Sequence, residues 1–177
     1  MILPILPSKK SLSNVLVLLL FAPMFLFSGC KKIENLATVN PAASTKFTIP
    51  GAVPGTISFV TPDNDNPNTG KAWLVSKANL DKVTLTVENP SGQTFQFIKS
   101  IRFFLQAEGL AEVEVANRFD IENSVGSSME LNATGVDLKE YLKKEKFRLR
   151  VEVVTDEVVI QSVQVKADLL FKVVILV

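Results

Sequence analysis

The stretch Val83-Thr84-Leu85-Thr86-Val87 decides the fold of this chain, because apolar and polar residues alternate through it without interruption. Successive side chains of a β-strand point to opposite faces, so a period of two buries one face and leaves the other in water. Val and Thr are β-branched and favour extended backbone. The stretch is therefore predicted to be a half-buried strand, and Asn89-Pro90-Ser91-Gly92 after it predicts a turn.

The same period of two recurs along the rest of the chain. Apolar residues of one parity occur at Phe47 and Ile49, Ile57 and Phe59, Phe95 to Leu105, Val113 and Val115, Met129 and Leu131, Phe147 to Val153, and Val159 to Ile175. Lys99 interrupts the alternation, so we expect a bulge at 98–100. Glu108 and Gly109 predict a hairpin. The last run is longer than an ordinary strand, and we expect it to bend near Lys166 to Asp168.

One segment has the pattern of a helix. Asp137 with Glu140 three residues later resembles a capping box, and Leu138, Tyr141 and Leu142 fall on one helical face. About eight strands and one short helix predict an all-β, antiparallel, immunoglobulin-like β-sandwich. We place this single domain at residues 45–177, a length that can bury about two-thirds of its unfolded surface.

The N-terminal region has the three parts of a secretory signal. Lys9 and Lys10 precede an apolar run, Leu16 to Phe27, which ends at the small residues Ser28 and Gly29. A membrane-spanning helix needs about 20 apolar residues, and this run is shorter and contains Pro23. We therefore expect a cleaved signal peptide at 1–29 and a flexible tether at 30–44.

The end of this run resembles the lipobox of bacterial lipoproteins, with Ser28 and Gly29 directly before Cys30. Phe27 departs from that family, which usually carries Leu there. The resemblance implies that Cys30 receives a diacylglyceryl group and becomes the new N-terminus, so that lipid holds the protein on a membrane. A buried or reactive thiol is the alternative, although Cys30 is the only cysteine and has no disulfide partner within the chain.

The residues after Cys30 bear on the location. In lipoproteins that this sequence resembles, an aspartate directly after the cysteine marks retention in the inner membrane, and Lys31 stands there instead. Acidic clusters that route related proteins to the cell surface are also missing, with Glu34 the only acid nearby. The resemblance therefore implies the outer membrane, facing the periplasm.

Two later segments also carry a resemblance. The pieces within Val83 to Glu114 and Arg150 to Lys172 look like a family of lipid-anchored bacterial β-sandwich proteins that has no assigned activity. The Asn-Pro turn gives a looser similarity to desiccation-associated sandwich domains. These likenesses imply an anchored module and assign no catalytic residue.

Composition argues against several functions. The chain has 19 basic and 18 acidic residues, which gives no electrostatic footprint for nucleic acid. Histidine, the commonest general base and zinc ligand, is missing. No phosphate-cradling or dinucleotide-binding glycine pattern occurs, so we expect no cofactor and no enzyme. A hydrolase with a carboxylate pair, active on glycans, stays an alternative.

Two weak binding candidates remain. The loop with Asp63 and Asp65 concentrates oxygen ligands that calcium could use, but Pro67 and Leu74 break the EF-hand pattern, and an ordinary loop explains the same residues. Trp73, the only tryptophan, could stack on a sugar or a partner, or be buried at a sheet edge.

The function predicted from the sequence is a binding or structural interaction module. Aliphatic residues left over at Val174, Leu176 and Val177 indicate a protein partner or a homodimer, and coverage by the tether is the equal alternative. The crowded phenylalanines between Phe95 and Phe104 also permit a carrier of an apolar ligand, or simply a filled core.

Overall fold

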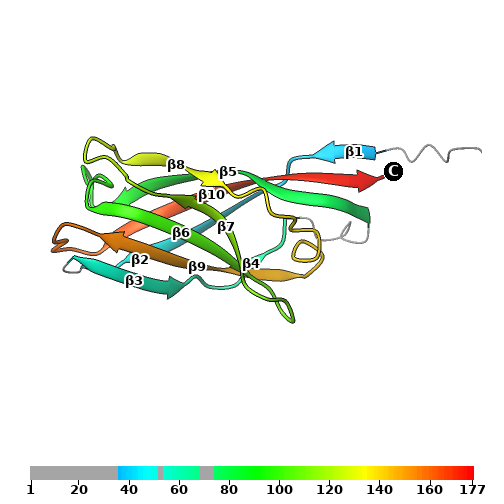
Figure 1. Cartoon of the computed structure of the whole chain (residues 1–177), viewed down its shortest axis with the longest axis horizontal. Helices are drawn as coiled ribbons and strands as arrows, with labels where there is room; N and C mark the ends of the chain where they lie inside the picture. Colours follow the sequence, from blue (N-terminus) through cyan, green and yellow to red (C-terminus); the bar gives the residue numbers. More distant parts are fainter. Residues whose placement is uncertain (1–35, 52–53, 68–73) are drawn as a thin grey trace, which may run out of the picture. The chain divides into compact units, whose positions relative to one another are not determined.

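The computed structural model describes residues 36–51, 54–67 and 74–177, which belong to one compact unit, Asn35–Val177. The described residues form ten antiparallel strands and no helix (Figure 1). The strands are β1 Leu36–Val39, β2 Ala42–Ile49, β3 Gly55–Val60, β4 Asn64–Asp65, β5 Val75–Asn89, β6 Ile98–Gln106, β7 Val113–Arg118, β8 Ser128–Ala133, β9 Lys146–Thr155 and β10 Val163–Leu176.

All ten strands are linked into one hydrogen-bonded sheet. Its order is β1-β10-β5-β8-β7-β6-β9-β3, with β2 also beside β10 and β4 beside β9. One edge of β10 pairs with β5, and the other pairs first with β2 and then with β1. Between these two short partners, the Phe171 N–H donates to the Pro41 carbonyl at 2.9 Å. Strand β10 is thus bonded along both edges.

Aromatic side chains in the core connect strands that are not neighbours in the sheet. Phe47 of β2 contacts Phe59 of β3 with ring centroids 5.3 Å apart, and contacts Phe103 of β6 at 5.9 Å. Phe147 of β9 and Phe171 of β10 lie 6.3 Å apart. Since β2 and β3 lie near opposite ends of the strand order, these contacts bring the two halves of the sheet face to face.

The predicted parities are confirmed within the strands, although Phe95, Phe97 and Val159, which the pattern placed in strand runs, lie before β6 and β10. In β9 and β10 the side chains of the apolar parity are buried, from Phe147 to Val153 and from Val163 to Ile175. The bulge expected at 98–100 appears as a register shift between Ile98 and Ser100. The hairpin is confirmed too, and Gly109 has a φ of 73°, a backbone conformation that favours glycine.

The predicted helix is wrong. Residues 139–143 form turns and residues 144–145 form a bend, and one helix-like bond joins the Leu142 N–H to the Leu138 carbonyl at 2.9 Å. Leu138 also donates its N–H to the Ala78 carbonyl at 2.7 Å, and the Asp137 carboxylate accepts from the Ala78 N–H. Asp137 does accept a cap-like bond from the Lys139 N–H at 3.0 Å, but the bonds to β5 hold the segment in turns and not in a helix.

Three further expectations need correction. Strand β10 does not bend at Lys166 to Asp168, because its pairing with β2 and β5 is regular there; the shifts against β5 lie elsewhere, for example after Leu170. Residues 36–44, which were expected to belong to the tether, include β1 and the start of β2, and both strands pair with β10. An immunoglobulin-like sandwich of about eight strands with a helix is not confirmed, since ten strands form one continuous sheet.

Burial makes a testable difference between Phe103, on β6, and Phe119, which follows β7. Phe103 is fully buried and Phe119 is 54% exposed. We expect Phe103→Ala to lower the free energy of unfolding by about 3 to 5 kcal/mol, because it leaves a cavity in the core. Phe119→Ala should cost less than about 1 kcal/mol. Urea denaturation of both variants checks this, and equal losses of stability would contradict the different burial of the two side chains.

Candidate functional site

Five charged side chains form an arginine–glutamate ladder on the outer face of β6, β9 and the start of β7. They are Arg102, Glu112, Glu114, Arg150 and Glu152. Arg102 donates to Glu114 from Nε at 3.1 Å and to Glu152 from Nη1 at 3.3 Å. Arg150 donates to Glu112 from Nη2 at 2.8 Å and to Glu152 from Nη1 at 3.2 Å. Glu152 therefore links the two arginines.

An aromatic ring lies beneath the ladder. Phe104 belongs to the outward parity of β6 but is only 8% exposed. The guanidinium carbon of Arg150 lies 3.8 Å from its ring centroid, and that of Arg102 lies 4.7 Å away. Cation–π contact and the arginine stems together cover the ring. The ladder thus shields an apolar side chain on a polar face.

The charges of the ladder are matched to one another. The hydrogen bond from Arg150 lowers the pKa of Glu112, and that from Arg102 lowers the pKa of Glu114, in both cases against partial desolvation. Asn117 also donates to Glu114, at 2.7 Å. A carboxyl group with a lowered pKa stays ionised at neutral pH, so it suits an ion pair and not a general acid, which must carry a proton. The ladder is therefore built as a stabilising network.

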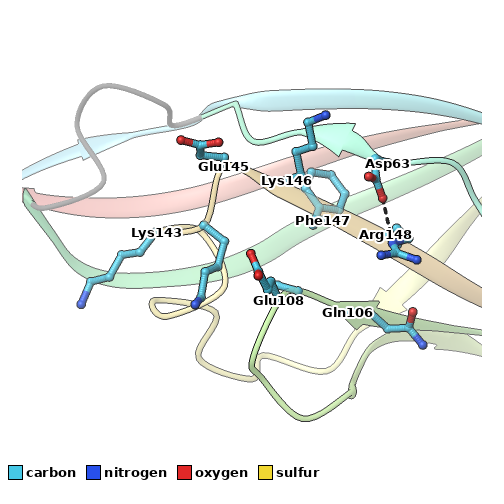
Figure 2. Close-up of a pocket in the computed structure, with 10 residues that line it drawn as sticks. Asp63, Gln106, Glu108, Lys143, Glu145, Lys146, Phe147 and Arg148 are labelled. Carbon is cyan, nitrogen blue, oxygen red and sulfur yellow. Dashed lines mark ion pairs between the residues drawn. The ribbon is translucent and has the colours of Figure 1, made fainter.

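A cleft of about 650 Å³ opens near the hairpin between β6 and β7 (Figure 2). We call it the lysine cleft. Its lining residues come from the segment before β4, the hairpin and the turns that lead into β9: Asp63, Gln106, Ala107, Glu108, Lys143, Lys144, Glu145, Lys146, Phe147 and Arg148.

Asn66 fixes one wall of the lysine cleft. Its buried side-chain amide donates to the carbonyls of Lys144 at 3.0 Å and Tyr141 at 3.3 Å. Its backbone N–H donates to the Glu145 carbonyl at 2.8 Å. A buried amide that satisfies these carbonyls holds the turn against β4.

Charges of both signs line the lysine cleft. Asp63 accepts from Arg148 Nε at 2.7 Å, as the dashed line in Figure 2 marks. Within the described residues, Lys144, Lys146 and Glu108 have no ion-pair partner. Sites for apolar ligands have mostly apolar walls. This cleft suits a polar or charged partner.

A second cleft, of about 440 Å³, lies between the 90–97 turn and residues 157–161. We call it the distal cleft. Ile160 is 91% exposed and Val158 is 64% exposed beside it. A Cβ on Gly51 would lie 2.9 Å from the carbonyl oxygens of Val159 and Ile160, so only glycine permits this close approach. The loop is packed closely and still presents two aliphatic side chains.

The structure does not group the predicted calcium candidates into a cation site. Asp63 is ion-paired with Arg148, and Asp65 is exposed on β4. Among the described residues, no group of three or more His, Cys, Asp or Glu side chains could hold a metal ion. Cys30 and Trp73 lie outside the described residues.

The arginine–glutamate ladder and the distal cleft were not predicted from the sequence. The sequence did contain a signal for the ladder, because its charged residues lie on the polar parity of the predicted strands. The register that aligns Arg102 with Glu152 and Phe104 with Arg150 was needed to see it. No pattern in the sequence predicts that Val158 and Ile160 are exposed.

Comparisons with known proteins give no assignment. A scan against protein-family models finds no match, and a search of curated proteins finds no similar sequence. The part of the chain that the structure describes contains no helix able to span a membrane.

Three solved viral structures are similar to this chain. The decameric BFDV capsid protein is 10% identical with a TM-score of 0.40, over 80% of this chain and 99% of that chain. Tomato aspermy virus is 14% identical with a TM-score of 0.28, over 73% and 76%. Desmodium yellow mottle tymovirus is 12% identical with a TM-score of 0.29, over 78% and 90%. TM-scores this low carry no argument about function.

The ladder predicts how stability depends on pH. Because the pKa of Glu114 is lowered in the folded state, its ion pair stabilises the fold above the unfolded pKa of about 4.3. That contribution is lost as the pH falls through the folded pKa. Glu114→Gln should lower the free energy of unfolding at pH 7 by roughly 0.5 to 1 kcal/mol. As the pH falls below about 4.3, the variant should lose less stability than the wild type.

Urea denaturation between pH 7 and pH 3 measures both effects. Glu108→Gln is the matched control, because Glu108 has no ion-pair partner in the described part of the chain. Identical pH profiles for Glu114→Gln and wild type would show that the ladder does not stabilise the fold.

Proposed function

We propose that this chain is a lipoprotein of the bacterial cell envelope whose β domain is a binding or structural interaction module. The observation that carries the proposal is the apolar run that ends in Ser28, Gly29 and Cys30. The cysteine carries the lipid, and its acyl chains hold the mature protein on the membrane without spanning it. Lys31 in place of an aspartate favours the outer membrane, facing the periplasm.

The distal cleft supports the interaction part of the proposal. Ile160 and Val158 are exposed aliphatic residues next to a hollow surface, a combination typical of protein contact sites. Gly51 keeps their loop packed, so little ordering is lost when a partner binds. In this proposal the two facing halves of the sheet act as a sandwich that presents its loops.

No observation favours the two alternatives. A hydrolase needs a carboxyl group with a raised pKa as general acid, whereas the pKa values of Glu112 and Glu114 are lowered. A carrier of an apolar ligand needs an apolar pocket, whereas the lysine cleft has mostly charged walls. We therefore propose a non-enzymatic role, without a cofactor and without nucleic acid as a partner.

Cys30→Ala tests the anchor. Wild-type protein expressed in a bacterium should incorporate labelled palmitate and sediment with membranes, whereas Cys30→Ala should incorporate none and retain its signal peptide. Lys31→Ala is the control, since it leaves the acceptor thiol in place. Equal labelling and equal membrane binding of Cys30→Ala would show that Cys30 is not the lipid site.

A photo-reactive amino acid at position 160 tests the interaction module. After illumination of intact cells, we expect one defined cross-linked species from position 160. The same residue at Glu130, which is exposed on β8, is the control. Similar cross-linking from both positions, or none from either, would contradict a contact site at the distal cleft.

A further inference from the structure

An apolar surface lies at the end of β10 that carries the C-terminus. Leu36 of β1 is directly opposite Leu176 of β10 in the register, and their side chains are 58% and 37% exposed. Val177, which follows, is 72% exposed. Val173 and Ile175 are buried, so Val174 and Leu176, which have the other parity, point outward. We call the surface of Leu36, Val174, Leu176 and Val177 the β1–β10 tip.

Lysines flank the β1–β10 tip. Lys77 of β5 is opposite Val174, and Lys172 lies two residues before Val174 on the same outward parity. Neither lysine has an ion-pair partner within the described residues. The last acid on this parity of β10 is Asp168, which pairs with Lys166 at 2.9 Å. The side chains of the tip are therefore apolar, and the nearest charged side chains of β5 and β10 on this face are Lys77 and Lys172.

We propose that the β1–β10 tip lies against the lipid bilayer, with its aliphatic side chains in the headgroup region and its lysines on lipid phosphates. This inference rests on the proposed lipid at Cys30. Aliphatic side chains beside lysines are the pattern of proteins that lie on an anionic bilayer surface. Lysine stems pass along apolar surface and place the charge at the headgroups.

The length of the tether is the reason for choosing a bilayer as the occupant. Leu36 is six residues after Cys30, and an extended chain spans at most about 3.6 Å per residue. The lipid therefore keeps Leu36 within roughly 20 Å of the headgroups, whatever the tether's conformation. Because β1 pairs with β10, Leu176 and Val177 are kept there with it (Figure 1). At this distance the bilayer is always present at high effective concentration.

The same arrangement places the distal cleft far from the membrane. Strand β10 has 14 residues, and a β-strand rises about 3.3 Å per residue, so its two ends are roughly 45 Å apart. The tip is at its C-terminal end, and residues 157–161 of the distal cleft precede its N-terminal end. With the tip on the bilayer, Ile160 is held away from it, where a partner can reach it.

Spin labels test the docking. Once Cys30 is acylated, an introduced cysteine is the only free thiol, so Leu176→Cys and Ser91→Cys can each carry one nitroxide. Ser91 is the control, because it is exposed in the turn at the far end of β5. The acylated proteins are reconstituted into vesicles of phosphatidylethanolamine and phosphatidylglycerol. Collision with oxygen and with a water-soluble nickel complex is then measured by EPR.

We expect the label at position 176 to lose collisions with nickel at least threefold relative to position 91 and to gain collisions with oxygen. Lys77→Gln combined with Lys172→Gln should weaken this shielding, whereas Lys99→Gln, a change of an exposed lysine on β6, should not. Equal accessibility at positions 176 and 91 in acylated protein would overturn the docking and leave the anchor intact.

Two further outcomes would also overturn the docking. In one outcome, the shielding at position 176 disappears when the protein is diluted in the vesicles, and the labels show dipolar broadening before dilution. That outcome would assign the tip to a second copy of the chain. Mass spectrometry that finds no acyl group on Cys30 would overturn the anchor itself, and the docking with it.

Discussion

Strand β10 is hydrogen-bonded along both edges, and the rest of the structure depends on that pairing. Strand β5 pairs with one edge, while β2 and then β1 pair with the other. Unpaired backbone groups in a buried strand are costly, so a strand this long needs partners along its whole length. The alternation from Val163 to Ile175 also fixes the register, because a slip of one residue would turn the buried apolar side chains toward water.

Much of this fold could be predicted because its signals are local. Alternation of β-branched and polar residues gave the strand parities, Lys99 indicated the bulge, and Gly109 indicated the hairpin. The helix at 137–145 could not be excluded in this way, since its cap-like bond from Lys139 to Asp137 is present and only the structure shows the bonds to Ala78, in a strand far away in the sequence. Strand β1 was not predicted either, for a different reason. Residues 36–39 are mostly exposed at a sheet edge, so their alternation is weak.

The candidate sites were less predictable than the strands. The loop with Asp63 and Asp65 was a weak calcium candidate in the sequence, and the structure shows Asp63 in an ion pair with Arg148. The arginine–glutamate ladder depends on the register between β6 and β9, and the distal cleft depends on a close approach at Gly51. Each feature forms between two segments that are far apart in the chain. The sequence of one segment alone therefore does not predict it.

In the proposed function, the orientation of the domain depends on how residues 36–39 meet the sheet. Because β1 pairs with β10, only a short tether separates the domain from the proposed lipid at Cys30, and in the proposed arrangement β10 is a spacer between the bilayer and the distal cleft. If those residues were a free stalk, the domain would take any orientation. Hydrogen exchange of the lipid-free mature chain with Cys30→Ser, followed by NMR, distinguishes the two. The account predicts that amides among residues 36–39 are protected at least tenfold over an unstructured peptide, and exchange at the unstructured rate throughout 36–39 would contradict it.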